Sequence, residues 1–436
     1  MSVMNHGALR KPSIPKLSLT PAEQHAVENE AAALLTQTLQ IEHDFFVNDG
    51  VVDEQHWKHL KSSDNFSIYK ERYTATESSQ DDSTSWKSSD SFGPNMRSAS
   101  IDSDDILSNK KNARVPLIVS TGHVEGSVED VVFGFAAPDS QSWRFRSAYT
   151  KDQFADSKIL ATIHEPSEER PFNYLCIKWF VTMFPAILQI FVDPRDSLII
   201  EACGVKVDEH GQRYGYHIIH SYEHPAIVSM EASGICRSSV SMCFIIREVR
   251  PGKVHVFSRG FVDPKGDMSP NVVVMFASKA VLTTAKTVEV SFAKKLVWLM
   301  AEQERERQDS RRRGRVDSSE MIDSEACVSC GKTPGFLNAK LATCRLCREK
   351  FCSKCTSQHR VVVDVTRKEV TERTFPFCVR CVFKAKQMSP HVVAVEKARQ
   401  NANRVDSSAS SSQRSASSTG LDSQRSLTSD PGLSDR

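Results

Sequence analysis

Eight cysteines within 55 residues constrain this chain more than any other feature of its sequence. They form four Cys-x-x-Cys pairs, whereas the other four of its twelve cysteines are scattered. Two thiolates separated by two residues can reach one tetrahedral metal ion from a single turn, and a second pair completes the ligand set. The chain opens with MSVMNHGALRKPSIPK, which lacks the apolar run of a signal peptide, so we expect reduced thiols in the cytoplasm. The pattern predicts two zinc ions.

The spacing of the pairs indicates which of them share an ion. Only four residues separate Cys347 from Cys352, too few for the two central pairs to share one ion comfortably. We therefore predict an interleaved arrangement. One ion takes Cys327, Cys330, Cys352 and Cys355, and the other takes Cys344, Cys347, Cys378 and Cys381. Because this segment has few large apolar side chains, metal binding is expected to supply most of its folding free energy.

The order of these cysteines and the segment FPFCVRCVF at 375–383 resemble a FYVE zinc finger. The resemblance implies docking on membranes that carry phosphatidylinositol 3-phosphate, and hence a peripheral protein of endosomal membrane trafficking. The residues it assigns to headgroup and membrane contact are Phe336, Leu337, Lys340, Arg345 and Arg373. Residues 327–381 include eleven basic and four acidic side chains, a net charge of +7, which suits an anionic lipid surface.

Alternatives for this finger stay open. Ala342 and Thr343 stand where the FYVE family has two histidines. A RING-type ubiquitin ligase shares the interleaved ligands but usually has a histidine among the central ones, where this chain has Cys347. No alternation of aromatic and basic residues indicates a nucleic-acid partner, and none is expected. The competing class of function is a protein-interaction adaptor without lipid cargo, which binds a small GTPase or another protein.

The chain before the finger is long enough to bury a core of its own. Capping boxes at 20–23 and 127–130 predict two helix starts. Glycines at 211 and 252 supply the turns of two hairpins, which indicates an antiparallel sheet. Its strands are predicted at 66–73, 115–121, 158–165, 173–184, 196–207, 213–222, 241–249 and 253–262. Apolar residues at steps of three and four predict a last, long helix from Ser269 to about Arg307.

Three stretches resemble a START lipid-transfer domain: IKWF and FVDPRDSLIIEACG within 177–204, GYHIIHSYEHP at 215–225, and FVDPKGDMSP at 261–270. The resemblance covers 20–308 and implies a helix-grip fold, in which an antiparallel sheet wraps a long C-terminal helix around a tunnel for one hydrophobic lipid. Arg195 and Asp196 match the family's charged pair, which we interpret as a structural ion pair. A START domain followed by a FYVE-type finger is similar to a group of oomycete proteins.

An apolar run and a group of histidines in this region each have an alternative interpretation. The apolar run 174–192 carries one charge, Lys178, and a lysine in mid-membrane costs about 2.5–3.5 kcal/mol, so a strand is favoured over a membrane span. His217, His220 and His224 lie near Ser221, but alternation along a strand turns His217 and His220 to opposite faces. No catalytic residues are assigned, and the protein is expected not to be an enzyme.

The expected organisation is therefore an α+β protein with two modules. It consists of a disordered N-terminus (1–19), a START-like domain (20–308) with a disordered Ser- and Asp-rich insert (76–113), a basic linker (309–322), a two-zinc FYVE-type finger (323–386) and a Ser-rich disordered tail (387–436).

Overall fold

The computed structural model describes eleven stretches of the chain. They are residues 14–63, 65–72, 105–152, 154–182, 193–266, 274–275, 277–278, 281–313, 325–333, 340–366 and 369–403.

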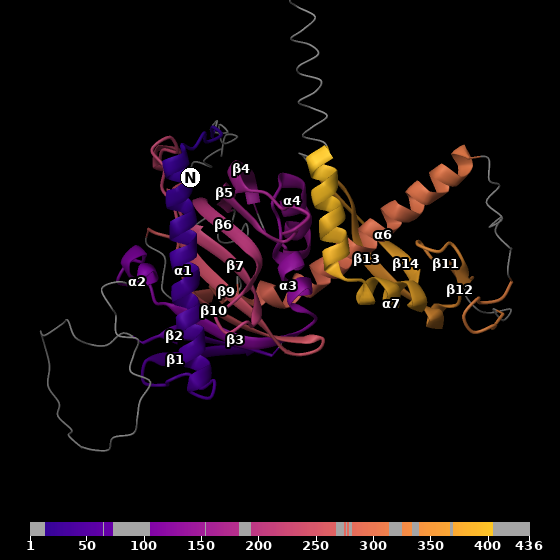
Figure 1. The fold of residues 1–436 in the computed structure, drawn as a ribbon, viewed down its shortest axis with the longest axis horizontal. Coiled ribbons are helices and arrows are strands. Elements are labelled where there is room, and N and C mark those ends of the chain that lie inside the picture. Colours follow the sequence, from indigo (N-terminus) through magenta and orange to yellow (C-terminus); the bar gives the residue numbers. More distant parts are fainter. Residues whose placement is uncertain are drawn as a thin grey trace, which may run out of the picture.

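A ten-stranded sheet is the largest element of the structure (Figure 1). Its strands follow the order β1-β2-β3-β10-β9-β7-β6-β5-β4, and neighbours along this path are antiparallel, while β8 pairs in parallel with β6. The strands are β1 (Trp57–Ser63), β2 (Phe66–Glu71), β3 (Ile118–Glu125), β4 (Phe154–His164), β5 (Tyr174–Thr182), β6 (Arg195–Val207), β7 (Arg213–Ser221), β8 (Cys236–Arg237), β9 (Ser239–Arg250) and β10 (Lys253–Asp263). The antiparallel sheet predicted from the hairpins is confirmed, and Gly211 and Gly252 have the positive φ that their turns require.

Helix α1 (Pro21–Val47) covers one face of this sheet. Thr20 caps it as predicted: the threonine hydroxyl accepts a hydrogen bond from the Glu23 backbone, and the Glu23 carboxylate accepts one from the Thr20 backbone. Leu34 of α1 belongs to one core with Ile177 and Ile200 of the central strands. Because successive strand residues point to opposite faces, Lys178 and Glu201 point away from α1.

Helices α3 (Val128–Phe135), α4 (Ser140–Thr150) and α6 (Thr287–Arg312) lie on that opposite side. The predicted capping box at Ser127 and Asp130 starts α3, and the Asp130 carboxylate also accepts hydrogen bonds from Ser291 and Lys295 of α6. Helices α3 and α6 touch so closely that a Cβ on Gly134 would lie 2.0 Å from the backbone oxygen of Thr287. A long helix against the sheet is thus present, but α6 begins at Thr287 and not at Ser269, and a 3₁₀ turn, η2 (Thr283–Lys286), precedes it.

The cysteine-rich segment forms a short hairpin, a longer hairpin and a helix beside α6 (Figure 1). Its elements are β11 (Ala342–Thr343), β12 (Lys350–Phe351), the 3₁₀ turn η3 (Ser353–Cys355), β13 (Thr356–Val365), β14 (Val370–Cys378) and α7 (Val379–Gln387). Leu296 and Leu299 of α6 pack with Phe351 and Phe377 of the finger in one buried cluster. The finger therefore packs against α6 through a shared hydrophobic core and is not connected to the sheet domain by a linker alone.

Three hydrogen bonds and a second buried cluster strengthen this contact. The Tyr149 hydroxyl of α4 donates to the Arg360 carbonyl at 3.3 Å and accepts from the Val362 backbone at 3.2 Å. The buried Lys295 ammonium reaches the Met388 carbonyl at 3.2 Å, just beyond α7. Val362 packs with Val290 of α6 and with α4.

Three predicted boundaries of disorder are wrong. Residues 14–19 lie along β4, with the Leu17 backbone donating to the Leu160 carbonyl at 2.9 Å. The insert predicted over 76–113 includes helix α2 (Ile106–Lys110), whose cap Asp105 forms an ion pair with Arg259 at 2.6 Å. Residues 390–403, which were predicted to belong to the disordered tail, are helical. Burial of Val393 and neighbouring small residues against the sheet domain stabilises this helix.

Other predictions fall wholly or partly outside the described residues. Phe336 and Leu337 lie there, as do 183–192 of the apolar run 174–192, whose first half is strand β5. Within the stretches that are described, none of the helices combines the length and apolar character needed to cross a bilayer.

Candidate functional site

The first cysteine group lies at the edge of the finger and unites its first and third pairs. The sulfurs of Cys327, Cys330, Cys352 and Cys355 all lie within 4.8 Å of one another. The Cys330 and Cys352 sulfurs are 3.7 Å apart. Zn–S bonds of about 2.3 Å at tetrahedral angles place two sulfurs about 3.8 Å apart, so this group has the size of a zinc site.

The second group, Cys344, Cys347, Cys378 and Cys381, lies against the core shared with α6. The Cys347 and Cys378 sulfurs are 3.9 Å apart, again close to a tetrahedral edge. The backbone of Cys378 donates to the Cys344 sulfur at 3.3 Å, and the backbone of Cys381 donates to the Cys378 sulfur at 3.4 Å. Such bonds favour thiolates over thiols. The interleaved pairing predicted from the sequence is confirmed: each group can hold one metal ion.

The buried cysteines outside the finger differ from the metal-binding groups in the pKa of their thiols. Burial raises the pKa of Cys176, Cys203 and Cys243 to about 12. These thiols remain protonated at neutral pH, so they behave as core side chains and not as nucleophiles or metal ligands.

Of the predicted headgroup residues that the structure describes, Arg345 directly follows Cys344 of the second group, and Arg373 lies opposite Val361 in the β13–β14 hairpin. Lys340 and Arg373 are exposed. The Arg345 guanidinium lies over the Phe375 ring, 5.0 Å from its centre. Burial, followed by the charges of Arg345 and Arg307, lowers the pKa of the Arg348 guanidinium.

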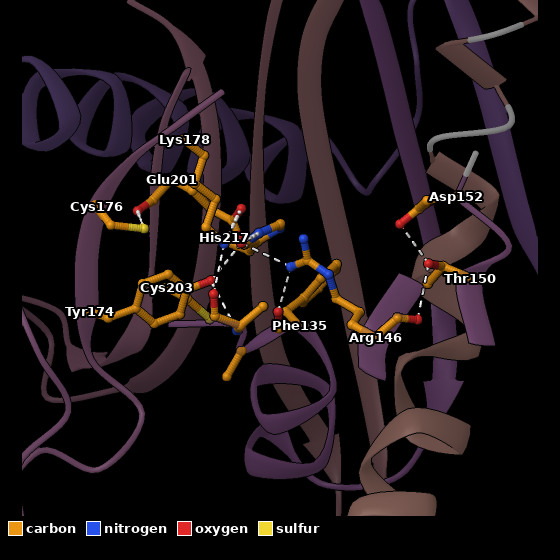
Figure 2. A network of polar contacts seen from close by, with 12 residues as sticks. Phe135, Arg146, Thr150, Asp152, Tyr174, Cys176, Lys178, Glu201, Cys203 and His217 are labelled. Atoms are coloured by element: carbon orange, nitrogen blue, oxygen red, sulfur yellow. Dashed lines mark hydrogen bonds and ion pairs between the residues drawn. The ribbon is translucent and has the colours of Figure 1, made fainter. Parts of the chain in front are cut away.

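A buried charge network on the inner face of the sheet, opposite α1, was not predicted (Figure 2). Glu201 of β6 is at its centre and is 1 % exposed. Its carboxylate accepts hydrogen bonds from Arg146 at 2.8 Å, Lys178 at 2.8 Å and the Tyr174 hydroxyl at 2.6 Å, and contacts His217 Nε2 at 3.3 Å. Although burial raises the pKa of Glu201, the charges of Arg146 and Lys178 hold it well below its usual range.

The cations of this network also complete the C-terminal end of α3. The Arg146 guanidinium donates to the Phe135 carbonyl at 2.6 Å, and Lys178 donates to the Ala137 carbonyl at 2.7 Å. Lys294 of α6 donates to the Ala136 carbonyl at 2.7 Å, and its burial lowers its pKa well below the usual value. Positive groups at a helix C-terminus satisfy its free carbonyls and interact favourably with its dipole.

Polar atoms around this network lack partners among the residues that the structure describes. His217 Nδ1, Trp143 Nε1 and Ser147 Oγ are buried and unbonded there. Burial lowers the pKa of His217, which favours the neutral ring, and the Lys178 ammonium lies 4.6 Å from the centre of the Trp143 ring. The region thus combines one carboxylate, two cations and unused hydrogen-bonding groups within an otherwise apolar interior.

Sequence reasoning missed this network, although a signal was present. Lys178 and Glu201 are lone charges in the middle of apolar strands, YLCIKWFV and SLIIEACG, where a charged residue needs a partner. The pairing of Lys178 with Glu201 follows only from the register of β5 on β6, which the sequence does not give.

The other histidines and the predicted charged pair have structural contacts. His220 lies 3.0 Å from Glu30 of α1 and also bonds Ser241. Arg195 and Asp196 were predicted to pair at a strand start, but their contacts are with other groups. Arg195 donates to the Pro264 carbonyl at 2.7 Å, which ties β6 to the segment after β10.

Asp196 is bound from two sides. It accepts a hydrogen bond from the Trp179 indole at 2.9 Å and forms an ion pair with Arg237 at 2.8 Å. These contacts join β5, β6 and β8, so the role of Asp196 is to position strands.

Comparison with family models finds no match to this chain, and comparison with curated proteins finds none either. Solved structures that match part of this chain include the human StAR-related lipid transfer protein 5, with 17 % identity and a TM-score of 0.38 over 61 % of this chain and 98 % of that one. The human StarD13 lipid transfer and protein localization domain has 17 % identity and a TM-score of 0.33, over 58 % of this chain and 94 % of that domain. A STAR-related lipid transfer protein fragment from Xanthomonas axonopodis has 11 % identity and a TM-score of 0.33, over 53 % and 96 % of the two chains.

Proposed function

We propose that this protein binds one hydrophobic lipid in its START-like domain and that a two-zinc finger brings it to anionic membranes, including those of endosomes. The observation that carries lipid binding is the buried network around Glu201. A buried charge cluster contributes little net stability, because desolvation offsets its attraction. The network is better explained as the anchor of a polar headgroup whose acyl or ring portion lies among the apolar residues around it.

The unpartnered atoms support a specific kind of headgroup. Trp143 Nε1 can only donate a hydrogen bond, and Arg146 and Lys178 bring two positive charges against the single negative charge of Glu201. A lipid whose headgroup accepts hydrogen bonds therefore fits better than one with a cationic headgroup. The ligand class is a lipid with a hydroxyl, ester or phosphate oxygen that reaches the region between α4 and β5.

Zinc and the membrane form the second part of the proposal. The two groups of four cysteines have the donor set and spacing of structural zinc sites. Zinc at these positions holds the basic finger in shape, and a net charge of +7 over 327–381 attracts an anionic leaflet. Lys340 and Arg373, which are exposed, face solvent and are available to lipid headgroups.

Lipid binding is tested by organic extraction and mass spectrometry of the purified full-length protein, followed by titration with the lipid found. We expect Trp143→Phe to weaken binding of that lipid at least about fivefold, because it removes one donor and keeps the ring. Trp298→Phe is the matched control, since Trp298 Nε1 is also buried and has no partner among the described residues, but lies where α6 meets the finger. A protein without copurifying lipid, or equal effects of both variants, would refute the proposed headgroup site.

A further inference from the structure

Helix α4 has two sides with different partners. Trp143 and Arg146 lie on the side of the buried network, where Arg146 donates to the Glu201 carboxylate at 2.8 Å. Phe145 and Tyr149 belong to a buried cluster that includes residues of α6 and of the finger. Residues three or four apart share one side of a helix, so these two pairs mark opposite sides of α4. One short helix therefore contacts both the network and the finger.

The β13–β14 hairpin of the finger binds α4 through its backbone. The Tyr149 hydroxyl donates to the Arg360 carbonyl at 3.3 Å and accepts a hydrogen bond from the Val362 backbone at 3.2 Å. Just after β13, the Thr366 carbonyl accepts a hydrogen bond from the Arg144 side chain at 2.8 Å. Because the finger contributes backbone groups to these three bonds, the bonds depend on the hairpin being folded.

The two cysteine groups hold the base of this hairpin. Cys355 of the first group directly precedes β13, and Cys378 of the second group is the last residue of β14. Thr356 and Cys378 are paired across the base. A hairpin of two strands is at best marginally stable in water, so a metal ion in each cysteine group would stabilise it from its base. Zinc loading is therefore expected to strengthen the contact of the hairpin with α4.

Helix α4 is too short to be stable without these contacts. It has 11 residues, and isolated helices of this length are marginal in water. Its order depends on packing along both of its sides. Loss of the hairpin contact would therefore loosen Trp143 and Arg146 together with Tyr149, because all three side chains are attached to the same helix.

We propose that the β13–β14 hairpin positions Trp143 and Arg146 through α4, so that zinc in the finger and lipid in the sheet domain strengthen each other's binding. The inference rests on the proposed lipid site around Glu201 and describes how that site is regulated. Tyr149 is the positioning residue, since its hydroxyl bonds the hairpin and its helix carries the two network residues. By linkage, lipid raises the affinity for zinc by the same factor as zinc raises the affinity for lipid.

The test uses the full-length protein, zinc-loaded or treated with a chelator, and phosphatidic acid with a fluorescent acyl chain as the probe. We expect chelation to weaken binding of this probe at least about tenfold. Tyr149→Phe keeps the ring and removes both hydrogen bonds, so it should weaken binding at least about threefold in the zinc-loaded protein. Arg144→Gln, which removes the third bond to the hairpin, is a second variant with the same expected direction.

A matched control and a measurement without lipid accompany the titration. Arg307→Gln removes a hydrogen bond between α6 and the Leu346 carbonyl of the finger but keeps the hairpin contacts with α4, so its probe affinity should not change. Hydrogen exchange of the α4 backbone amides, measured without lipid, should become faster on chelation and in Tyr149→Phe, but not in Arg307→Gln.

The outcomes separate this coupling from the proposed lipid site. Weaker probe binding and faster exchange in Tyr149→Phe, with Arg307→Gln unchanged, support the coupling. Equal probe affinity with and without zinc overturns the coupling and leaves the lipid site standing, and equal weakening in Tyr149→Phe and Arg307→Gln overturns it too. If the zinc-loaded protein binds no probe, the lipid site fails for a phosphate headgroup. Exchange then decides whether the hairpin positions α4: faster exchange in Tyr149→Phe supports this role, and unchanged exchange overturns it.

Discussion

Replacing Glu201 by glutamine should destabilise the protein strongly. The substitution keeps the shape of the side chain but leaves the Arg146 and Lys178 charges in an interior where Glu201 is 1 % exposed and Lys178 is fully buried. Breaking one side of a buried ion pair costs about 3–5 kcal/mol, because the remaining charge is uncompensated. For a domain of this size each kcal/mol lowers the melting temperature by about 2–4 °C, so a decrease of roughly 6–20 °C is expected.

The assay is thermal and urea unfolding followed by circular dichroism, with Glu248→Gln as the control. Glu248 lies on the exposed end of β9, where a substitution should change stability by less than about 0.5 kcal/mol. The double variant Glu201→Gln with Lys178→Met should recover part of the loss, since it removes both members of one pair. A loss below about 1 kcal/mol for Glu201→Gln, without recovery in the double variant, would refute the closed network derived from these distances.

Three further predictions concern the finger, the helix contact and acid stability. Treatment with a chelator should release two zinc ions per chain, measured with a colorimetric indicator, and should expose the apolar surface of α6 to a hydrophobic dye. The Cys344→Ser variant should lose one zinc ion and give the same dye signal. Full retention of zinc in this variant would contradict the assigned ligands. Gly134→Ala should cost about 1–3 kcal/mol in urea unfolding, since its Cβ would meet the backbone of α6, and an unchanged midpoint would contradict that contact. Although burial raises the pKa of Glu30, hydrogen bonds from His220 and Lys110 bring it to about 2. Ionised Glu30 should therefore contribute about 1–2 kcal/mol to the free energy of unfolding above pH 4.5, and this contribution should be lost as the pH falls towards 2. The Glu30→Gln variant should lack this pH dependence in urea unfolding.

Local signals in the sequence predicted the elements of the large domain well. The capping boxes at Thr20 and Ser127 and the turn glycines at Gly211 and Gly252 act within a few residues, so the sequence contains everything that determines them. The ligand sets of the finger were predictable in part, because the short gap between Cys347 and Cys352 argues against the two central pairs sharing an ion, whereas the choice between sequential and interleaved pairs depends on the fold. The resemblance of the finger to the FYVE family and to oomycete proteins stays a prediction, since no comparison shows either of them.

What the sequence did not reveal depends on contacts between distant residues. The cluster around Glu201 unites α4, β5, β6 and β7, and only the register of the strands shows that its members meet. The helix over 390–403 was hidden because its buried side chains are few and small, which gives a weak apolar pattern beside a Ser-rich tail. The docking of the finger could not be predicted from the sequence. The apolar residues of α6 pack against both the sheet domain and the finger, but their periodicity indicates only that the helix has a buried side.

Helix α6 packs against both the sheet domain and the finger, and this limits where residues can be inserted in the chain. Its residues Ser291 and Lys294 contact the sheet domain, while Leu296 and Leu299 face the finger. Each residue inserted between these sets would turn the finger by about 100° and move it by about 1.5 Å relative to the sheet domain. An insertion between Lys294 and Leu296 would therefore turn the finger, together with Leu299 and Arg307, relative to the sheet domain, whereas residues added after the helix would leave this orientation unchanged.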